Sequence, residues 1–215
     1  MTTQFLLNKV VEPRATLILA HGSGQPMDSP FMTRMAALIA SDDAFVVEVA
    51  RFNFPYMERA AAEGRRRPPD PAARLEAAWM DAIDAMAGRR PNLFIGGKSL
   101  GGRIATMVAD AADVTGVVCL GYPFHPPGKP ERLRTAHLEH VATPVLILQG
   151  ERDPFGSKDE VSGYDLSPRV RVEWLADGDH GLAPRKRSGV GHEENLARAA
   201  RRTVEFIAEL VATRS

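Results

Sequence analysis

The sequence predicts an α/β fold in which a mostly parallel central sheet has helices on both faces and no large cap domain. Short strand-like runs that are largely apolar alternate along the chain with longer, alanine-rich segments. Such strands are typical of a parallel sheet that is covered on both faces. The chain's 215 residues suffice for a core without disulfides or metals and leave little sequence for an inserted cap. We therefore expect residues 1–215 to form a single domain.

Six segments have the composition of buried strands. Each is a short run dominated by apolar and β-branched residues, and turn-forming residues flank it. In chain order the strands are expected over residues 15–20, 44–50, 92–95, 115–120, 144–148 and 170–175. The segment 63–71, which is rich in Arg and Pro, predicts an exposed connection.

Four longer segments predict helices. The first begins with Ser29, which suits the N-cap, and Pro30, which fits the first helical position. Asp70 and Pro71 form the same pair at the start of the second, where apolar side chains recur on one face. The helices are expected, in order, over residues 29–40, 70–87, 100–112 and 192–212.

Charge and composition argue against several classes of function. Lys and Arg total 27, as do Asp and Glu, so the formal net charge is zero and no global cationic field attracts nucleic acid or a membrane surface. No apolar run approaches the roughly 18 residues of a spanning helix. A single cysteine, Cys119, fits a reducing compartment, and the first residues do not resemble a signal peptide. We expect a cytoplasmic protein without nucleic-acid or membrane partners. We make no prediction about its oligomeric state.

The segment Gly97-Lys98-Ser99-Leu100-Gly101 carries the strongest chemical signal. It joins a predicted strand directly to a predicted helix, as a nucleophile elbow does, and its glycines leave room for a sharp turn that exposes the serine. The Leu100 N–H then points to the place where an oxyanion would form, at the positive end of the helix dipole. The segment therefore predicts Ser99 as a nucleophile.

Two nucleotide-binding motifs fail at a required position. Gly97-Lys98-Ser99 is similar to the end of a P-loop, but that motif needs glycine where Asn92 stands. The segment 22–24 after the first strand is similar to a dinucleotide fingerprint, but Met27 occupies the place of the third glycine. We therefore expect no nucleotide cofactor.

Two later strands end in residues that could activate Ser99. Asp153 follows the strand 144–148 and His180 follows the strand 170–175, so both belong to the same edge of a parallel sheet. Serine, acid and histidine then occur in the order that this architecture uses. His180 would take the Ser99 proton, and Asp153 would hold the imidazole in place. The other carboxylates that compete for the role of the acid are Glu151, Asp177 and Asp179.

Four further histidines have structural interpretations. His21 ends the first strand and is expected to shape the loop that follows, and His192 is expected near the start of the last helix. His137 and His140 are expected to share a helix and to lie on its surface face. Their spacing lacks that of the zinc-protease motif and no third ligand is apparent, so we expect no metal.

Together these motifs resemble those of the α/β-hydrolase superfamily, in its dienelactone-hydrolase-like branch. Within that branch the chain is similar to the short hydrolases related to a hydrolase-like subunit of the NSL chromatin complex. The segments that carry the resemblance are 20–31, 51–56, 96–103, 121–128 and 178–180.

The resemblance implies hydrolysis of a small ester or thioester through an acyl-enzyme, with Ser99, Asp153 and His180 as the triad and no cofactor. It also implies that the second oxyanion donor beside Leu100 is a backbone N–H of the loop after the first strand. Of Gly22, Ser23 and Gly24 we choose Ser23, and a neighbouring N–H is the alternative. A non-catalytic binding or scaffolding module on the same fold remains the alternative. A peptidase would share the triad but usually has extra domains that select peptides.

Five residues are candidates for contact with substrate: Lys98, Tyr56, His125, Arg185 and Arg187. Cations gather beside the nucleophile and in the loop after His180, so we expect a preference for esters with a carboxylate, held by Arg185 or Arg187. The alternatives are that His125 is a packed loop residue, and that the arginines face solvent or pair with Glu193 and Glu194.

Overall fold

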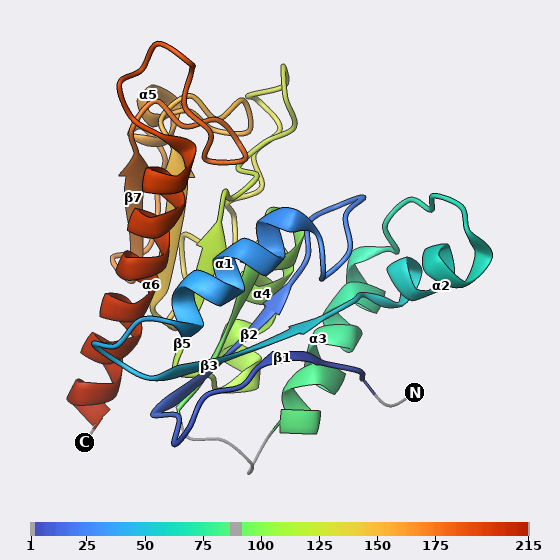
Figure 1. The fold of residues 1–215 in the computed structure, drawn as a ribbon. Helices are drawn as coiled ribbons and strands as arrows, with labels where there is room; N and C mark the ends of the chain where they lie inside the picture. The colour runs from blue at the N-terminus through green and yellow to red at the C-terminus, as the bar shows by residue number, and fades with distance from the viewer. Residues whose placement is uncertain (1–2, 87–91, 215) are drawn as a thin grey trace.

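The computed structural model describes residues 3–86 and 92–214, which fold around a seven-stranded sheet (Figure 1). The strand order is β1-β3-β2-β4-β5-β6-β7. Every neighbouring pair is parallel except β1 and β3. The strands are β1 (Leu6–Asn8), β2 (Ala15–Ala20), β3 (Val47–Phe52), β4 (Leu93–Lys98), β5 (Gly116–Leu120), β6 (Val145–Gly150) and β7 (Val170–Leu175). The helices are α1 (Pro30–Ala40), α2 (Pro55–Glu63), α3 (Ala72–Met86), α4 (Leu100–Ala112), α5 (Lys158–Val161) and α6 (His192–Arg214).

The predicted fold class is confirmed, with differences at the ends of elements. The strand expected over 44–50 lies at Val47–Phe52, and the strand expected over 92–95 continues to Lys98. The helix expected over 70–87 ends at Met86, and Ala87 lies outside the described residues. Three observed elements, β1, α2 and α5, were not predicted from the sequence. These are an edge strand of 3 residues and helices of 9 and 4 residues, lengths at which periodicity is hard to recognise.

The prediction of a helix that contains His137 and His140 is wrong. Residues 136–140 form turns, in which Leu138 N–H donates to Thr135 O and His140 N–H donates to His137 O. The His137 side chain lies against α4, with its Nε2 2.8 Å from Thr106 Oγ1. Two consecutive turns and this long-range contact hold the segment, so no helical ladder forms.

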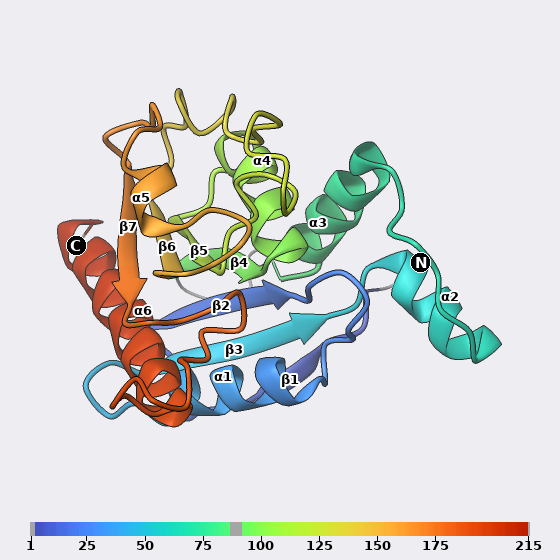
Figure 2. The ribbon, with the colours of Figure 1, turned by 90° about the horizontal axis from the view of Figure 1, so that it is seen from above.

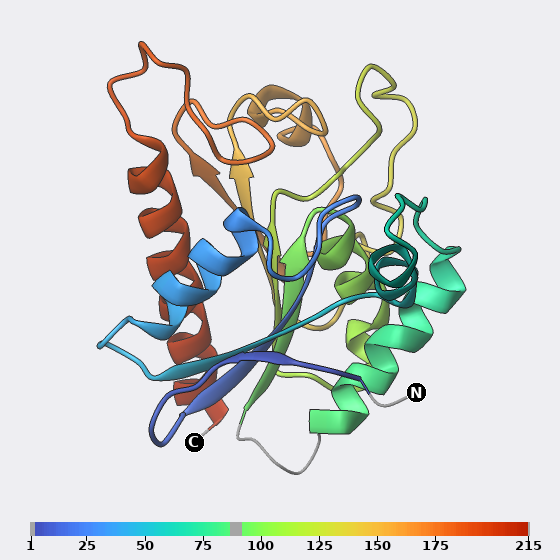
Figure 3. The ribbon, with the colours of Figure 1, turned by 45° about the vertical axis from the view of Figure 1, so that its right-hand side comes forward.

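Helices cover both faces of the sheet, as the apolar strands predict. Figure 3 shows α1 and α6 on one face and α3 and α4 on the other. A separate apolar cluster fills the space on each side. The strands between them, β2, β3, β5 and β6, are buried along their whole length. Parallel strands of this kind place every carboxyl end at one edge of the sheet.

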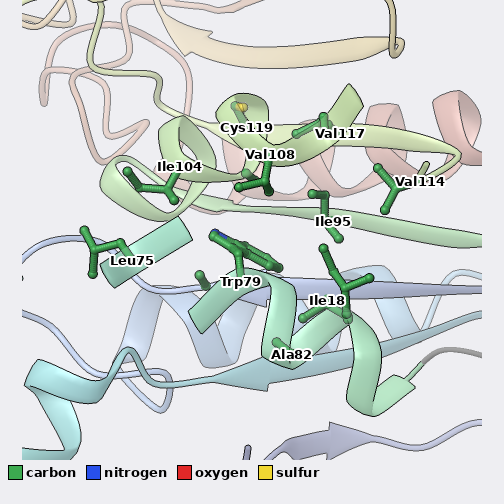
Figure 4. Close-up of a cluster of buried hydrophobic side chains, with 14 of the residues drawn as sticks. Ile18, Leu75, Trp79, Ala82, Ile95, Ile104, Val108, Val114, Val117 and Cys119 are labelled. Carbon is green, nitrogen blue, oxygen red and sulfur yellow. The ribbon is translucent and has the colours of Figure 1, made fainter. Parts of the chain in front are cut away.

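Trp79 fixes the start of α4, and with it the turn that carries Ser99. Figure 4 shows the indole projecting from α3 toward α4 and the sheet, with Ile95 and Val108 beside it. Trp79 is fully buried, and its Nε1–H donates to Gly101 O at 3.3 Å. The first turn of α4 is thereby anchored to the neighbouring helix.

The loops after β5 and β7 rise beyond the carboxyl edge of the sheet (Figures 1 and 3). Figure 2 looks onto this edge from above and shows α2 on the opposite side of the molecule from β7. No cap domain lies over the edge in the described part of the chain. No helix among residues 3–86 and 92–214 is long and apolar enough to cross a membrane.

Candidate active site

Ser99 occupies a strained turn between β4 and α4. Its φ of 49° and ψ of −110° lie outside the regions that a residue with a Cβ normally adopts. Two backbone hydrogen bonds hold the turn: Ser99 N–H donates to Leu120 O at 3.2 Å, and Arg103 N–H donates to Ser99 O at 3.0 Å. The neighbouring strand and the first turn of α4 therefore impose the conformation that presents the hydroxyl.

Glycine is required on both sides of Ser99 because the backbone of β2 passes close by. A Cβ on Gly97 would lie 2.1 Å from Ala20 O, and a Cβ on Gly101 would lie 2.3 Å from the same oxygen. No side chain fits at either distance unless the backbone moves. The glycines of the elbow are therefore packing requirements that let α4 approach β2.

We expect Gly101→Ala to lower the free energy of unfolding by about 1–3 kcal/mol, as overpacking against rigid backbone does. Urea denaturation measures this change. Gly163→Ala is the control, since the nearest atom to a Cβ there is Glu160 O at 3.6 Å, and its stability should stay within about 0.5 kcal/mol of the wild type. Equal denaturation midpoints for Gly101→Ala and the wild type would contradict this account of the elbow.

Ser99, His180 and Asp153 form one chain of hydrogen bonds. The Ser99 hydroxyl lies 2.9 Å from His180 Nε2, and His180 Nδ1 lies 2.8 Å from Asp153 Oδ2. An ionised carboxylate only accepts hydrogen bonds, so it fixes the proton on Nδ1 and leaves Nε2 free to accept the serine proton. The side chain of Asp153 is fully buried and that of His180 is 22% exposed. The three residues predicted from the sequence are thus brought together.

Both carboxylate oxygens of Asp153 have additional donors. Gln149 Nε2 donates to Oδ2 at 2.9 Å, and Phe155 N–H donates to Oδ1 at 2.8 Å. Gln149 also accepts from Tyr122 N–H at 2.7 Å, so it connects the loops after β5 and β6. Gln149 is not among the site residues predicted from the sequence. The sequence does contain a signal for its role, because Gln149 is a polar residue near the end of an apolar strand and precedes Asp153 by four positions.

The three competing carboxylates are engaged elsewhere. Glu151 accepts from Asp177 N–H at 2.9 Å, and Asp179 Oδ1 accepts two backbone N–H groups in its own turn. Asp177 lies 2.7 Å from Arg152 and 2.6 Å from Arg185. The hydrogen bond from Arg185 lowers the pKa of Asp177 to about 2. These residues shape the loop that carries His180.

Lys98 lies beside His180 on the wall of the cleft. Its Nζ donates to His180 O and lies 5.4 Å from the centre of the Phe31 ring. Burial lowers the pKa of Lys98 to about 8. Burial is also the main reason why the pKa of His180 is lowered. The hydrogen bond with Asp153 opposes that shift, and the charge of Lys98 adds to it.

His21 holds the loop that faces Ser99. Its Nδ1–H donates to Gly22 O at 2.7 Å, and its Nε2 accepts from Phe54 N–H at 3.1 Å. Burial lowers the pKa of His21 to about 4, so the ring is neutral at pH 7. A Cβ on Gly22 would lie 3.7 Å from Ser99 Cβ, which shows how close this loop comes to the serine. The structural interpretation of His21 agrees with these contacts.

A cleft of about 610 Å³ opens over Ser99. Ser23 and Leu100 line it, and neither backbone N–H donates a hydrogen bond to another described residue. Both N–H groups are therefore available to an oxygen in the cleft, as a pair of oxyanion donors requires. The remaining wall comes from the loop after β2 and the first turn of α1, from Pro69, from α4 and from the loops after β5, β6 and β7.

Lys98 alone among the five candidates for substrate contact lies on the wall of this cleft. Tyr56 is buried behind the wall, with its ring 5.7 Å from that of His21. His125 is 2% exposed, and its Nδ1 lies 2.9 Å from Pro126 O, so it is the packed loop residue of the alternative interpretation. Arg187 is exposed and away from the cleft wall.

Arg185 is exposed and does not line the cleft either. Its guanidinium pairs with Asp177, which is near in sequence, rather than with an acid of α6 or with the cleft. Glu193 pairs instead with Arg34 at 2.7 Å. The arginines that do line the cleft are Arg103 and Arg134, which the sequence analysis did not single out. Residues 3–86 and 92–214 contain no group of three or more His, Cys, Asp or Glu side chains placed to hold a metal ion.

Comparison with known proteins places the chain in a family. Residues 13–208 match the model of the alpha/beta hydrolase domain family. The fold is similar to that of a dienelactone hydrolase from Anabaena variabilis, with a TM-score of 0.73 and 20% identity over 96% of this chain and 91% of that one.

Two further structures share the fold. One is an α/β serine hydrolase without a lid from Xanthomonas campestris, with a TM-score of 0.67 and 17% identity over 94% of this chain and 89% of that one. The other is Est1E from Butyrivibrio proteoclasticus, with a TM-score of 0.68 and 11% identity over 97% and 94%. With the family match extending over most of its length, the chain belongs to the alpha/beta hydrolase domain family.

Proposed function

We propose that the protein is a serine hydrolase that cleaves a small ester or thioester through an acyl-enzyme. The observation that carries the proposal is the unbroken line of hydrogen bonds from Ser99 through His180 to Asp153, at 2.9 and 2.8 Å. A serine hydroxyl is a weak nucleophile until an adjacent base takes its proton. Within the family, the stretches 20–31 and 51–56 support a place near the short hydrolases related to the NSL complex subunit.

In the first half-reaction, Ser99 Oγ attacks the substrate carbonyl carbon while its proton moves to His180 Nε2. The carbonyl oxygen becomes an oxyanion, which the N–H groups of Ser23 and Leu100 stabilise. The intermediate then collapses. The bond to the leaving oxygen or sulfur breaks, that atom takes the proton from His180, and the acyl group stays on Ser99.

In the second half-reaction, water attacks the acyl-enzyme. The water gives a proton to His180 as its oxygen bonds to the acyl carbon, and the bond to Ser99 Oγ then breaks as Oγ takes that proton back. The products are the carboxylic acid and the free enzyme. Asp153 stabilises the imidazolium at both stages and remains ionised throughout.

The proposal is tested by turnover on p-nitrophenyl esters and acyl-thioesters of increasing chain length, with the wild type and Ser99→Ala side by side. A small-substrate hydrolase should turn over the short members, and the Ser99→Ala protein should not. Absence of turnover across both series would favour the alternative, a binding or scaffolding module on the same fold.

The acid limb of the pH profile reports on His180, which must be neutral to accept a proton. Burial and Lys98 lower its pKa, so kcat/KM should remain high below pH 6.5 and fall only as pH drops through the lowered value. Lys98→Met removes a positive charge that disfavours the imidazolium, and the acid limb should therefore move to higher pH. Lys129→Met, in an exposed turn, is the control and should leave the limb in place. An unmoved limb in Lys98→Met would show that Lys98 does not act on His180.

A further inference from the structure

Two arginines line the cleft that contains the proposed nucleophile. Arg103 lies on α4, one helical turn after Ser99, and Arg134 lies in the loop after β5. Both line the cleft that Ser99 and His180 line, and both are partly buried. Two cations from separate elements therefore converge on the space where a substrate would bind.

Neither guanidinium pairs with a carboxylate in the described part of the chain. Arg103 Nε is buried and lacks any hydrogen-bond partner there. Half of the other described arginines have an acidic partner; those in ion pairs are Arg34, Arg59, Arg65, Arg67, Arg74, Arg152, Arg171, Arg185 and Arg202. The other described arginines outside ion pairs are exposed to solvent, except Arg51, whose guanidinium donates to Met27 O, Thr33 Oγ1 and Asn8 Oδ1. Among the described arginines, a partly buried guanidinium without such partners is thus a feature of the cleft.

The surroundings do not neutralise the two charges. Burial and the charge of Arg103 both lower the pKa of Arg134. His137 is nearby, but burial and Arg103 lower its pKa to about 4, so it is neutral at pH 7. Tyr122 also stays neutral, because burial raises its pKa. Two partly desolvated cations without a counter-charge form a site that favours an anion.

We propose that Arg103 and Arg134 bind an oxyanion on the acyl part of the substrate, with a carboxylate as the best fit. The inference rests on the proposed function and specifies the substrate class of that site. Each guanidinium presents a planar set of N–H donors that matches a carboxylate, and two of them can hold one anion from two sides.

The position of Arg103 limits the length of the acyl group. Four residues along a helix correspond to a rise of about 6 Å, and helical side chains lean toward the N-terminus, here toward Ser99. The anionic group of the substrate that the arginines bind therefore lies only a few bonds from the carbonyl that Ser99 attacks. A half-ester of a short dicarboxylic acid, such as monoethyl succinate, has this shape.

The test compares kcat/KM for monoethyl succinate with that for ethyl levulinate, in which a neutral ketone replaces the carboxylate. The measured quantity is the ratio of the two values, since this cancels any general loss of activity. We expect a wild-type ratio well above one, and a roughly 10- to 100-fold fall in the ratio for Arg103→Met and for Arg134→Met. Added salt should also lower the wild-type ratio. Arg132→Met, an exposed neighbour in the same loop, should leave it unchanged.

Two outcomes separate the inference from the proposed function. Equal kcat/KM values for both esters, with the ratio unchanged in Arg103→Met and Arg134→Met, would overturn the proposed anion site at these arginines. The proposed hydrolase activity would still stand. If the wild type hydrolyses neither ester, calorimetric binding of monoethyl succinate to Ser99→Ala decides the matter. Binding that Arg103→Met weakens at least 10-fold supports the site, and its absence overturns it. Ethyl 3-phosphonopropionate, run as a third ester, shows whether a phosphonate is preferred to a carboxylate.

Discussion

Ser99→Ala is expected to lower kcat by roughly 10⁴- to 10⁶-fold, the range seen when the nucleophile of a serine triad is removed. The substitution deletes only the hydroxyl, whose hydrogen-bond partner is His180 Nε2. Alanine keeps the Cβ that serine already places in the strained turn with φ of 49°, so the thermal midpoint should change little. Residual activity over water can persist through the oxyanion donors.

His180→Ala tests the same step from the side of the base. Within the described part of the chain no other side chain is in place to take the Ser99 proton once the imidazole is removed, so the loss should be of the same order as in Ser99→Ala. The double variant should lose hardly more than either single variant, because the two residues act as one unit. Wild-type rates in Ser99→Ala would refute the mechanism, and multiplicative losses in the double variant would show that the residues act separately.

Asp153→Asn should lower kcat by up to about 10⁴-fold while the fold remains intact. An asparagine here cannot satisfy all its neighbours, because His180 and Gln149 donate to one oxygen of Asp153 and Phe155 N–H donates to the other. If the amide nitrogen faces His180, the imidazole must accept at Nδ1 and carry its proton on Nε2, where it no longer accepts from Ser99. If the amide nitrogen faces Phe155, its N–H and the backbone N–H of Phe155 point at each other in a buried site, and neither has an acceptor there.

Asp177→Asn and Asp179→Asn are the matched controls for this prediction. Asp177 pairs with arginines at the surface, and Asp179 accepts two backbone N–H groups through a single oxygen, which an asparagine retains. Both variants should keep kcat within a few-fold of the wild type. If kcat fell 10³-fold or more in either variant while Asp153→Asn stayed near wild type, the residue substituted in that variant, and not Asp153, would be the acid of the triad.

The sequence predicts the elements of the site that depend on local pattern. A buried strand that runs into Gly97 and on to Ser99 and Leu100 specifies the elbow, because only a tight turn joins a strand to a helix so abruptly. Asp153 and His180 each follow an apolar strand, and parallel strands bring their carboxyl ends to one edge. The expected convergence at that edge is what the structure shows.

Contacts that depend on tertiary placement were not predictable in the same way. Arg185 seemed available for substrate because it follows His180, yet a turn brings Asp177 against it across eight residues. Arg103 belongs to a helix whose orientation toward the cleft depends on the packing of Gly101 against β2. Arg134 reaches the same cleft from a loop without a regular pattern. Charge along the chain predicts an anion site at Arg185 or Arg187, whereas the arginines that line the cleft, and for which we propose that role, are Arg103 and Arg134.

The central claim is that Ser99 is the nucleophile, and reaction with a fluorophosphonate followed by peptide mass spectrometry tests it most directly. Such a reagent forms a stable phosphonyl adduct only with a serine that a neighbouring base activates. We predict one adduct per chain, located on Ser99, absent in Ser99→Ala and much slower to form in His180→Ala. An adduct on another residue, or equal labelling of the wild type and Ser99→Ala, would contradict the account.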